Sequence, residues 1–210
     1  MKYKHIIWDW NGTLLNDRWL CLESINILLT IRGNKALSDQ EYLDLFDFPV
    51  RDYYVRAGFD FSREDFKIPA LQFIDLYEKK RKECQLQDGA MEVLHHFSKL
   101  GISQSLLSAS EAGVLNDMVN HFGLRDYFQQ VTGLNNHYAA SKLELGKELL
   151  KKIGISPSEI LMVGDTCHDQ EVAHELGISV ILYDQGHFPA YRLKWCGCRI
   201  ISNLHELIDL

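Results

Sequence analysis

Two short acidic segments have the residue types that phosphate chemistry needs. Residues 9–13 read DWNGT and follow a short apolar run, and residues 164–169 read GDTCHD and follow another apolar run far downstream. A carboxylate can act as the nucleophile that forms an aspartyl-phosphate. Mg²⁺ prefers one or two carboxylates together with phosphate and water. An aspartate before a glycine turn is common by itself, so the hypothesis depends on the pairing of the two segments.

Two further polar residues could complete such a site. Phosphoryl transfer needs an in-line nucleophile, cations near the equatorial oxygens and donors that fix those oxygens. Ser108 follows an apolar run, and we expect it to offer a hydroxyl and a backbone N–H at a helix N-terminus, which binds anions. Lys142 opens a predicted helix and offers a positive charge. We therefore interpret Asp9 as the nucleophile, Asp165 and Asp169 as Mg²⁺ ligands, and Ser108 and Lys142 as phosphate-binding groups.

The apolar runs before these residues are typical of strands in a parallel sheet. Residues 6–8 are apolar on both faces, as a buried parallel strand requires. Comparable runs, several followed by a polar residue, lie at 102–107, 130–134, 160–163 and 180–183. Helical patterns between the runs end at Gly101, Gly123 and Gly154. The alternation over residues 86–210 predicts an α/β fold, a parallel Rossmann-like sheet with helices on both faces.

Residues 16–85 interrupt this alternation. A helical stripe lies at residues 19–29, and Ser38-x-x-Glu41 and Ser62-x-x-Asp65 are typical of helix starts. The segment contains no convincing strand. A helical block inserted after the first strand predicts a cap over the strand ends, where open α/β sheets hold ligands. We expect residues 1–15 and 86–210 to form the core and residues 16–85 to form an all-helical cap.

The composition argues against several classes of partner. The 210 residues contain 22 Lys and Arg against 29 Asp and Glu, a net charge of −7, which disfavours nucleic acid. We expect no membrane segment, since no apolar stretch approaches ~20 residues. Five scattered cysteines without a secretion signal predict a reducing cytoplasm, and the CGC sequence at residues 196–198 predicts a turn and no zinc site. The expected partner is a small phosphorylated metabolite; the sequence does not indicate an oligomeric state.

In order and spacing these segments resemble the haloacid dehalogenase-like hydrolases. The resemblance is to the subgroup with a small helical cap after the first motif, which includes phosphoglycolate phosphatase and β-phosphoglucomutase. It extends over essentially the whole chain, including FGLRDYF at residues 122–128 and LGI at residues 176–178. The resemblance implies three catalytic residues: Asp9, Ser108 and Lys142. It implies a set of phosphate-binding residues: Gly12, Thr13, Ser108, Ala109 and Lys142. It implies a set of Mg²⁺ ligands: Asp9, Asn11, Asp165 and Asp169.

Asn11 departs from the pattern of the family's phosphatases. In those enzymes an aspartate two residues after the nucleophile protonates the leaving oxygen and then activates water. An amide cannot exchange a proton at neutral pH, and general acid–base catalysis contributes typically ~10² to 10⁴-fold. The resemblance implies that this position binds the metal through its backbone carbonyl, which asparagine retains.

Three interpretations remain open. The chain could be a phosphatase of small phosphomonoesters such as phosphoglycolate, with sugar phosphates or nucleotides as alternatives. Its substrate would then have a leaving group that needs no proton, or its acid would be Asp17, His168 or a cap residue. It could be a non-phosphatase member, although the Asp-x-Tyr of dehalogenases and the Asp-x-Ala of phosphonoacetaldehyde hydrolases do not match Asn11. It could be a weakened phosphate- and Mg²⁺-binding regulatory protein. Retention of the other charged site residues favours a hydrolase, because a drifting pocket should lose carboxylates that repel one another.

Overall fold

The structure, a computed structural model, describes residues 2–134 and 141–210. The chain folds as two compact units. One consists of Met1–Asn16 with Leu86–Leu210, and the other is the helical unit, Asp17–Gln85. No helix among the described residues has the length and apolar character needed to cross a membrane.

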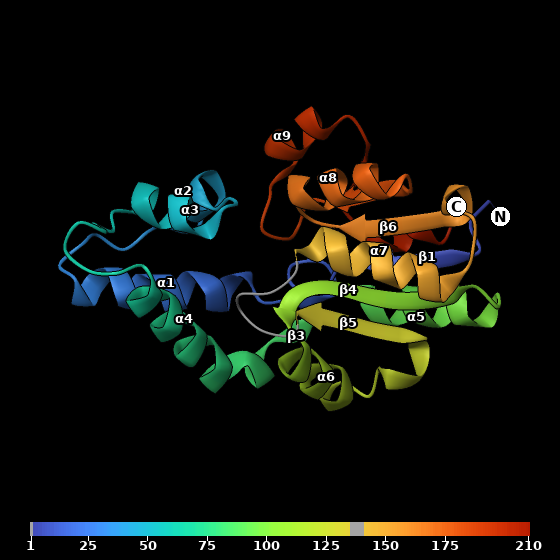
Figure 1. Ribbon diagram of the computed structural model, residues 1–210, viewed down its shortest axis with the longest axis horizontal. Helices are drawn as coiled ribbons and strands as arrows, with labels where there is room; N and C mark the ends of the chain where they lie inside the picture. The colour runs from blue at the N-terminus through green and yellow to red at the C-terminus, as the bar shows by residue number, and fades with distance from the viewer. Residues whose placement is uncertain (1, 135–140) are drawn as a thin grey trace. The chain divides into compact units, whose positions relative to one another are not determined.

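The first unit is built on a six-stranded sheet in the order β5-β4-β1-β6-β7-β8 (Figure 1). Every neighbouring pair is parallel. The strands are β1 (His5–Trp8), β4 (Ser103–Glu111), β5 (Gln130–Leu134), β6 (Ile160–Gly164), β7 (Ser179–Tyr183) and β8 (Arg199–Ile201). All four residues of β1 are buried, because β1 is central and has helices on both faces. The predicted α/β class with a parallel Rossmann-like sheet is confirmed.

Consecutive residues of β1 show how both faces of the sheet are covered. Ile7 packs in a cluster with Leu145 and Leu149 of α7 and Val172 of α8. The Trp8 ring lies 6.2 Å from the ring of Phe97 in α5. Successive side chains of a strand point to opposite faces, so these helices lie on opposite sides. The helices of this unit are α5 (Ala90–Lys99), α6 (Ala112–His121), α7 (Lys142–Ile153), α8 (Cys167–Leu176), α9 (Ala190–Leu193), η2 (Arg125–Tyr127), η3 (Pro157–Glu159), η4 (Lys194–Cys196) and η5 (Leu204–Leu207).

The helical unit has a core of its own, rich in aromatic side chains. Tyr42, Tyr53, Tyr54 and Phe59 are buried with aliphatic residues of α1, and α1 and α4 lie side by side (Figure 1). Its helices are α1 (Arg18–Ile31), α2 (Asp39–Leu45), α3 (Val50–Ala57), α4 (Lys67–Lys80) and η1 (Arg81–Glu83). A core of this kind buries enough apolar surface to stabilise short helices that would be marginal alone.

The two predicted helix starts in this unit have different outcomes. Ser38 and Glu41 form the predicted capping box at α2, since each side chain bonds the other residue's backbone N–H. The helix start predicted at Ser62 is wrong. Ser62 donates from its backbone and its hydroxyl to Asp60, which stabilises a turn, and α4 begins at Lys67.

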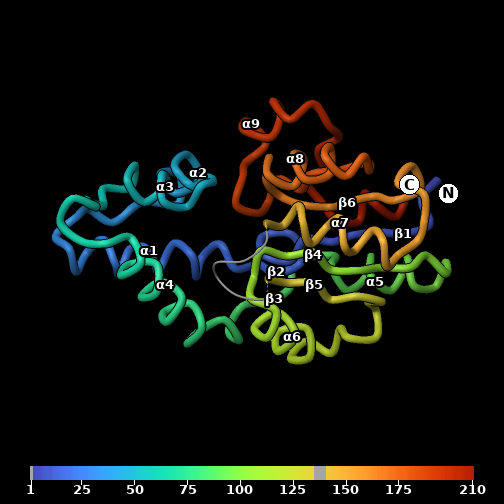
Figure 2. The backbone as a smooth tube through the Cα atoms, viewed as in Figure 1, coloured from blue at the N-terminus to red at the C-terminus, as the bar shows by residue number. Residues whose placement is uncertain are grey.

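Three short strands were not predicted from the sequence. Strands β2 (Leu15–Asn16) and β3 (Gln85–Leu86), labelled in Figure 2, form a separate two-stranded sheet, and β8 is an edge strand of the large sheet. Strands of two or three residues are too short to show a periodic pattern. Strands β2 and β3 lie where the chain leaves the first unit and returns to it.

Candidate active site

The register of the sheet gathers polar residues at the carboxyl ends of its central strands. Trp8 of β1 lies opposite Leu106 of β4 and Val163 of β6. Asp9 follows Trp8 directly, and Asp165 comes two residues after Val163. Because parallel strands end at the same edge, segments that are far apart in the sequence meet there.

Three buried carboxylates meet at this edge. The carboxylate oxygens offered by Asp9, Asp165 and Asp169 all lie within 4.8 Å of one another. Lys142 Nζ lies 2.5 Å from Asp9 Oδ1 and 2.5 Å from Asp169 Oδ1. Thr13 Oγ1 lies 3.1 Å from Asp165 Oδ1 and 3.4 Å from Asp9 Oδ2. The structure therefore brings together five of the residues that the sequence analysis selected, and we call them the carboxylate cluster.

The first turn of α8 fixes Asp169. Thr166 is the N-cap, and Asp169 Oδ2 accepts from the Thr166 backbone N–H at 3.0 Å and from its hydroxyl at 2.7 Å. The backbone N–H of Asp165 also donates to Asp169 Oδ2, at 3.2 Å. These bonds occupy one oxygen of Asp169 and direct the other, Oδ1, toward Lys142. The sequence analysis missed Thr166, although the spacing Thr166-x-x-Asp169 is that of a capping box.

The loop after β7 contacts Asp165. The backbone N–H of His187 donates to Asp165 Oδ2 at 2.7 Å. Gly12 has a φ of +75°, and a Cβ placed there or on Gly186 would overlap Asp165 Oδ2. Glycine is therefore required at Gly12 both by the backbone and by the close approach of the carboxylate. The Gln87 side chain donates to Gly12 O at 3.0 Å and supports this turn.

Burial and mutual repulsion perturb the acids of the cluster. Burial, with a contribution from Asp169, raises the pKa of Asp9 to about 6, although Lys142 opposes the shift. Burial and then the other two carboxylates raise the pKa of Asp165 to about 8, while His187 opposes the shift. Burial would also raise the pKa of Asp169, but the Lys142 charge and the Thr166 hydrogen bonds outweigh it and lower that pKa. The pKa of Lys142 is raised because its two carboxylate partners outweigh the effect of burial.

The donor set fits a divalent cation. The carboxylate cluster holds three buried carboxylates and one lysine, which pairs with Asp9 and Asp169. Hard oxygen ligands of this kind suit Mg²⁺. A bound cation would offset the burial and the carboxylate repulsion that raise the pKa of Asp165, which supports the metal roles predicted for Asp9, Asp165 and Asp169. The metal role of the Asn11 carbonyl stays a prediction.

Ser108 does not lie at a helix N-terminus, and that prediction is wrong. It is a buried residue of β4, which continues to Glu111 with a register shift between Leu107 and Glu111. Helix α6 begins at Ala112, and the Glu111 side chain caps it by accepting from Val114 N. The strand continues because Glu111 still pairs with Leu134 of β5. An anion bound at Ser108 would therefore contact residues of β4 and not the N-terminus of a helix.

Ser110 links Ser108 to Asn11. Ser108 Oγ accepts from Ser110 N at 3.1 Å, and Ser110 Oγ donates to Asn11 Oδ1 at 2.6 Å. Ala109, between the two serines, is exposed, as a backbone phosphate ligand would need to be. Ser110 was missed because a lone serine gives no signal of its own, although its spacing of two residues from Ser108 places both on one side of a strand.

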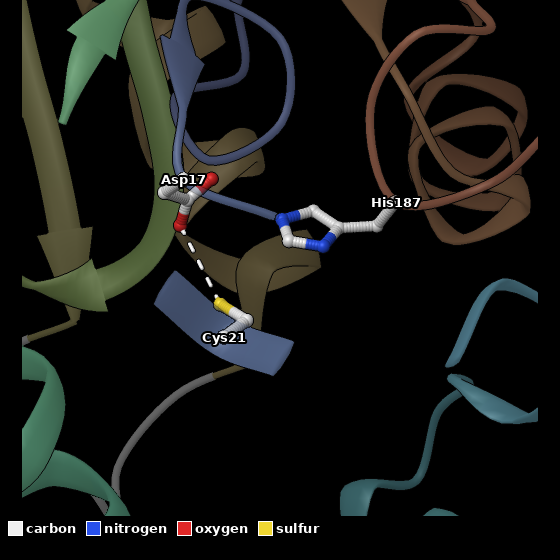
Figure 3. Close-up of side chains that lie close together, drawn as sticks. All are labelled: Asp17, Cys21 and His187. Atoms are coloured by element: carbon white, nitrogen blue, oxygen red, sulfur yellow. Dashed lines mark hydrogen bonds between the residues drawn. The ribbon is translucent and has the colours of Figure 1, made fainter. Parts of the chain in front are cut away.

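Asp17 and His168, the two residues named as possible acids because Asn11 cannot serve, are not members of the carboxylate cluster. Asp17 is buried in the helical unit and accepts hydrogen bonds from Tyr77 Oη at 2.8 Å and from Cys21 Sγ at 3.7 Å (Figure 3). His168 is partly exposed, and its Nδ1 lies 3.3 Å from Glu171 Oε2. Asp17 is therefore held within a buried network, and His168 belongs to the surface of α8.

A disulfide joins Cys167, in the acidic segment at residues 164–169, to Cys196. This bond was not predicted, because the five cysteines are scattered in the sequence and their spacing indicates no pairing. Twenty-nine positions separate the two residues, so their proximity comes from the tertiary fold.

Comparisons with known proteins agree with this geometry. A family model described as haloacid dehalogenase-like hydrolase matches residues 6–183. The chain is 23% identical to N-acetylmuramic acid 6-phosphate phosphatase of Pseudomonas aeruginosa, over 100% of this chain and 95% of that protein. It is 21% identical to phosphoglycolate phosphatase of Synechococcus elongatus, over 86% of this chain and 84% of that protein.

Solved structures show the same fold at low sequence identity. A haloacid dehalogenase-like family hydrolase from Streptococcus pneumoniae superimposes with a TM-score of 0.87. The match covers 99% of this chain and 98% of that one, at 16% identity. The family model spans most of the chain, and the carboxylate cluster lies within the matched residues. The chain belongs to the haloacid dehalogenase-like hydrolase family.

Proposed function

We propose that the protein is a Mg²⁺-dependent phosphatase of small phosphomonoesters that acts through an aspartyl-phosphate on Asp9. The observation that carries this proposal is the carboxylate cluster, in which Asp9 is buried beside Lys142 and two further carboxylates. Phosphoglycolate is the proposed substrate type, with sugar phosphates and nucleotides as alternatives. The names of two relatives, a phosphoglycolate phosphatase and an N-acetylmuramic acid 6-phosphate phosphatase, support this substrate class.

Each residue has a defined part in the proposed reaction. A carboxylate oxygen of Asp9 attacks phosphorus, the bond from phosphorus to the leaving oxygen breaks, and water later hydrolyses the aspartyl-phosphate. Lys142 holds the Asp9 carboxylate and carries a positive charge to the phosphoryl oxygens, and Ser108 and Thr13 offer hydroxyl donors. Mg²⁺, held by Asp9, Asp165, Asp169 and the Asn11 carbonyl, would neutralise charge on the phosphoryl group.

Asn11 supports a second candidate, a weakened enzyme that binds Mg²⁺ and phosphate for regulation. Its Oδ1 accepts from Ser110, and its amide cannot give or take a proton as the missing aspartate would. Turnover of an activated aryl phosphate separates the two candidates, because such a leaving group departs without protonation. A regulatory protein would bind phosphate with Mg²⁺ and leave aryl and acyl phosphates intact.

Replacing the nucleophile tests the proposed function. We expect Asp9→Asn to abolish Mg²⁺-dependent hydrolysis of a panel of aryl, acyl and alkyl phosphates while the fold is kept, because the change is nearly isosteric and removes the attacking oxyanion. Steady-state kinetics and circular dichroism measure the two effects. Asp88→Asn, an aspartate outside the carboxylate cluster, is the control and should keep wild-type rates. Hydrolysis retained by Asp9→Asn would exclude the aspartyl-phosphate route.

Removing the lysine tests what holds the cluster together. Lys142→Met leaves Asp9 and Asp169 without their shared cation, so we expect a loss of about 3–5 kcal/mol in the free energy of unfolding. Lys147→Met, on the same helix, removes only an exposed pair with Glu144 and should cost about 0–1 kcal/mol. Urea denaturation in the presence of a chelator measures both. Equal losses in the two variants would contradict the role assigned to Lys142.

The raised pKa of Asp165 predicts how Mg²⁺ binding depends on pH. In the metal-free protein this carboxyl keeps its proton up to about pH 8, whereas the unfolded chain loses it near the ordinary value of about 4. The metal-free fold therefore loses stability from this group as the pH rises through that window. Mg²⁺ must displace the proton, so the rise in Tm caused by millimolar MgCl₂ should be larger at about pH 8.5 than at about pH 6.5.

Asp165→Asn is the control for this dependence, because an amide has no proton to displace. Its Tm shift with MgCl₂ should be small and should change little with pH. Equal Tm shifts at both pH values in the wild-type protein, measured against a chelator, would show that Asp165 is not a protonated ligand of the metal site.

Restoring the missing acid tests the role of Asn11. Asn11→Asp should raise kcat/KM for alkyl phosphates much more than for aryl or acyl phosphates, since only poor leaving groups need a proton in the transition state. The upper limit is the ~10² to 10⁴-fold of a positioned acid. Ser110 can donate to the new carboxylate as it does to the amide. Asn11→Ala should give no selective gain, and an equal effect of Asn11→Asp on all substrates would place the proton donor elsewhere.

A further inference from the structure

We propose that Cys167 and Cys196 form a reversible redox modification site that controls the order of the carboxylate cluster. The two cysteines are joined by a disulfide. Cys167 is the first residue of α8, two positions after Asp165 and two before Asp169. Cys196 is the last residue of η4, in the segment that follows β7. The other three cysteines, all among the described residues, are free thiols.

The bond connects the two segments that hold Asp165 and Asp169. One is the start of α8, where the Thr166 cap binds Asp169 Oδ2. The other is the loop after β7, whose His187 N–H binds Asp165 Oδ2 at 2.7 Å. The disulfide closes residues 167–196, a segment that contains Asp169 and His187, and it ties the loop after β7 to the first residue of α8, so it limits how far the loop can move from α8. Reduction leaves the two segments with noncovalent contacts only.

The site is open to small redox reagents. Cys167 and Cys196 are only partly buried, and Trp195, next to Cys196, is 82% exposed. Cys84 provides a contrast, because it is completely buried and burial raises the pKa of its thiol to about 12. Cysteine reactivity follows exposure and local charge. A reagent in solution should therefore reach the Cys167–Cys196 bond before it reaches Cys84.

The chemistry requires one partner, a small-molecule disulfide or its thiol form. In oxidation, glutathione disulfide accepts two electrons from the two cysteine thiols. The sulfur–sulfur bond of glutathione disulfide breaks, the bond between Cys167 and Cys196 forms, and the two protons pass to the two glutathione molecules released. Reduction is the reverse exchange through a mixed disulfide. A reducing compartment would keep the pair as thiols, and oxidative conditions would close it.

The oxidised form is expected to be the better ordered one. With both segments tethered, Asp165 and Asp169 keep the positions that their hydrogen bonds define, and outer contacts of this kind typically change metal affinity about 10-fold or more. Closing a loop of this length should also raise the Tm by on the order of 10 °C, because it restricts the unfolded chain. The Tm and the thiol count need no substrate, whereas the metal affinity depends on the proposed function.

The experiment compares the whole protein equilibrated in glutathione disulfide and in reduced glutathione. Maleimide labelling after denaturation, read by mass spectrometry, should find three thiols in the oxidised protein and five in the reduced protein. Peptide mapping should assign the oxidised pair to Cys167 and Cys196. Calorimetry then measures the Tm without metal and the Kd for Mg²⁺. The oxidised form should have the higher Tm and the lower Kd.

Two serine variants make the test specific. Cys196→Ser should give the Tm and Mg²⁺ Kd of the reduced protein under both conditions. Cys198→Ser, two residues away in the same turn, removes a free thiol and should keep the full redox response. Five reactive thiols in the oxidised sample would overturn the proposal, and so would an oxidised pair whose Tm and Kd equal those of Cys196→Ser. If no form binds Mg²⁺ but the Tm still responds to oxidation, the result would contradict the proposed metal site and still support the redox site.

Discussion

The structure of the first unit depends on one electrostatic constraint, the burial of three carboxylates around a single ammonium group. Lys142 bonds Asp9 and Asp169 at 2.5 Å each, and Asp165 relies on backbone and hydroxyl donors instead. Buried charge is costly unless it is paired and hydrogen-bonded. The capping box of α8, the glycines around Asp165 and the Gln87 bond to the first turn can all be understood as ways of holding these acids close together.

Most of the sheet could be predicted from the sequence because its strands are buried on both faces. Continuous apolar runs such as residues 160–163 are a strong signal, and β6 covers Ile160–Gly164. Residue order also pointed to Asp9 and Asp165, since each comes just after such a run. Strand β8 gave no such signal, because its three residues include an exposed arginine at the edge of the sheet.

The contacts that orient the acids could not be predicted in the same way. The His187 bond to Asp165 uses a backbone N–H, which every residue except proline carries, so the side chain gives no clue. The extension of β4 through Ser108 depends on pairing with β5 and on the cap at Glu111, both of which are tertiary features. The Cys167–Cys196 bond depends on the path of the chain after β7, and the sequence contains no pattern for it.

The double use of Asp169 has a consequence for the dynamics of the site. The Asp169 carboxylate both caps the first turn of α8 and bonds Lys142. One group therefore stabilises the start of the helix and the geometry of the acids. Fraying of a helix end is normally the cheapest local opening in a protein and leaves distant parts intact. Here that opening would release Asp169 from Lys142 at the same moment. The amide hydrogens of the first turn of α8 should thus exchange with solvent as one cooperative group, at a rate set by whatever occupies the site.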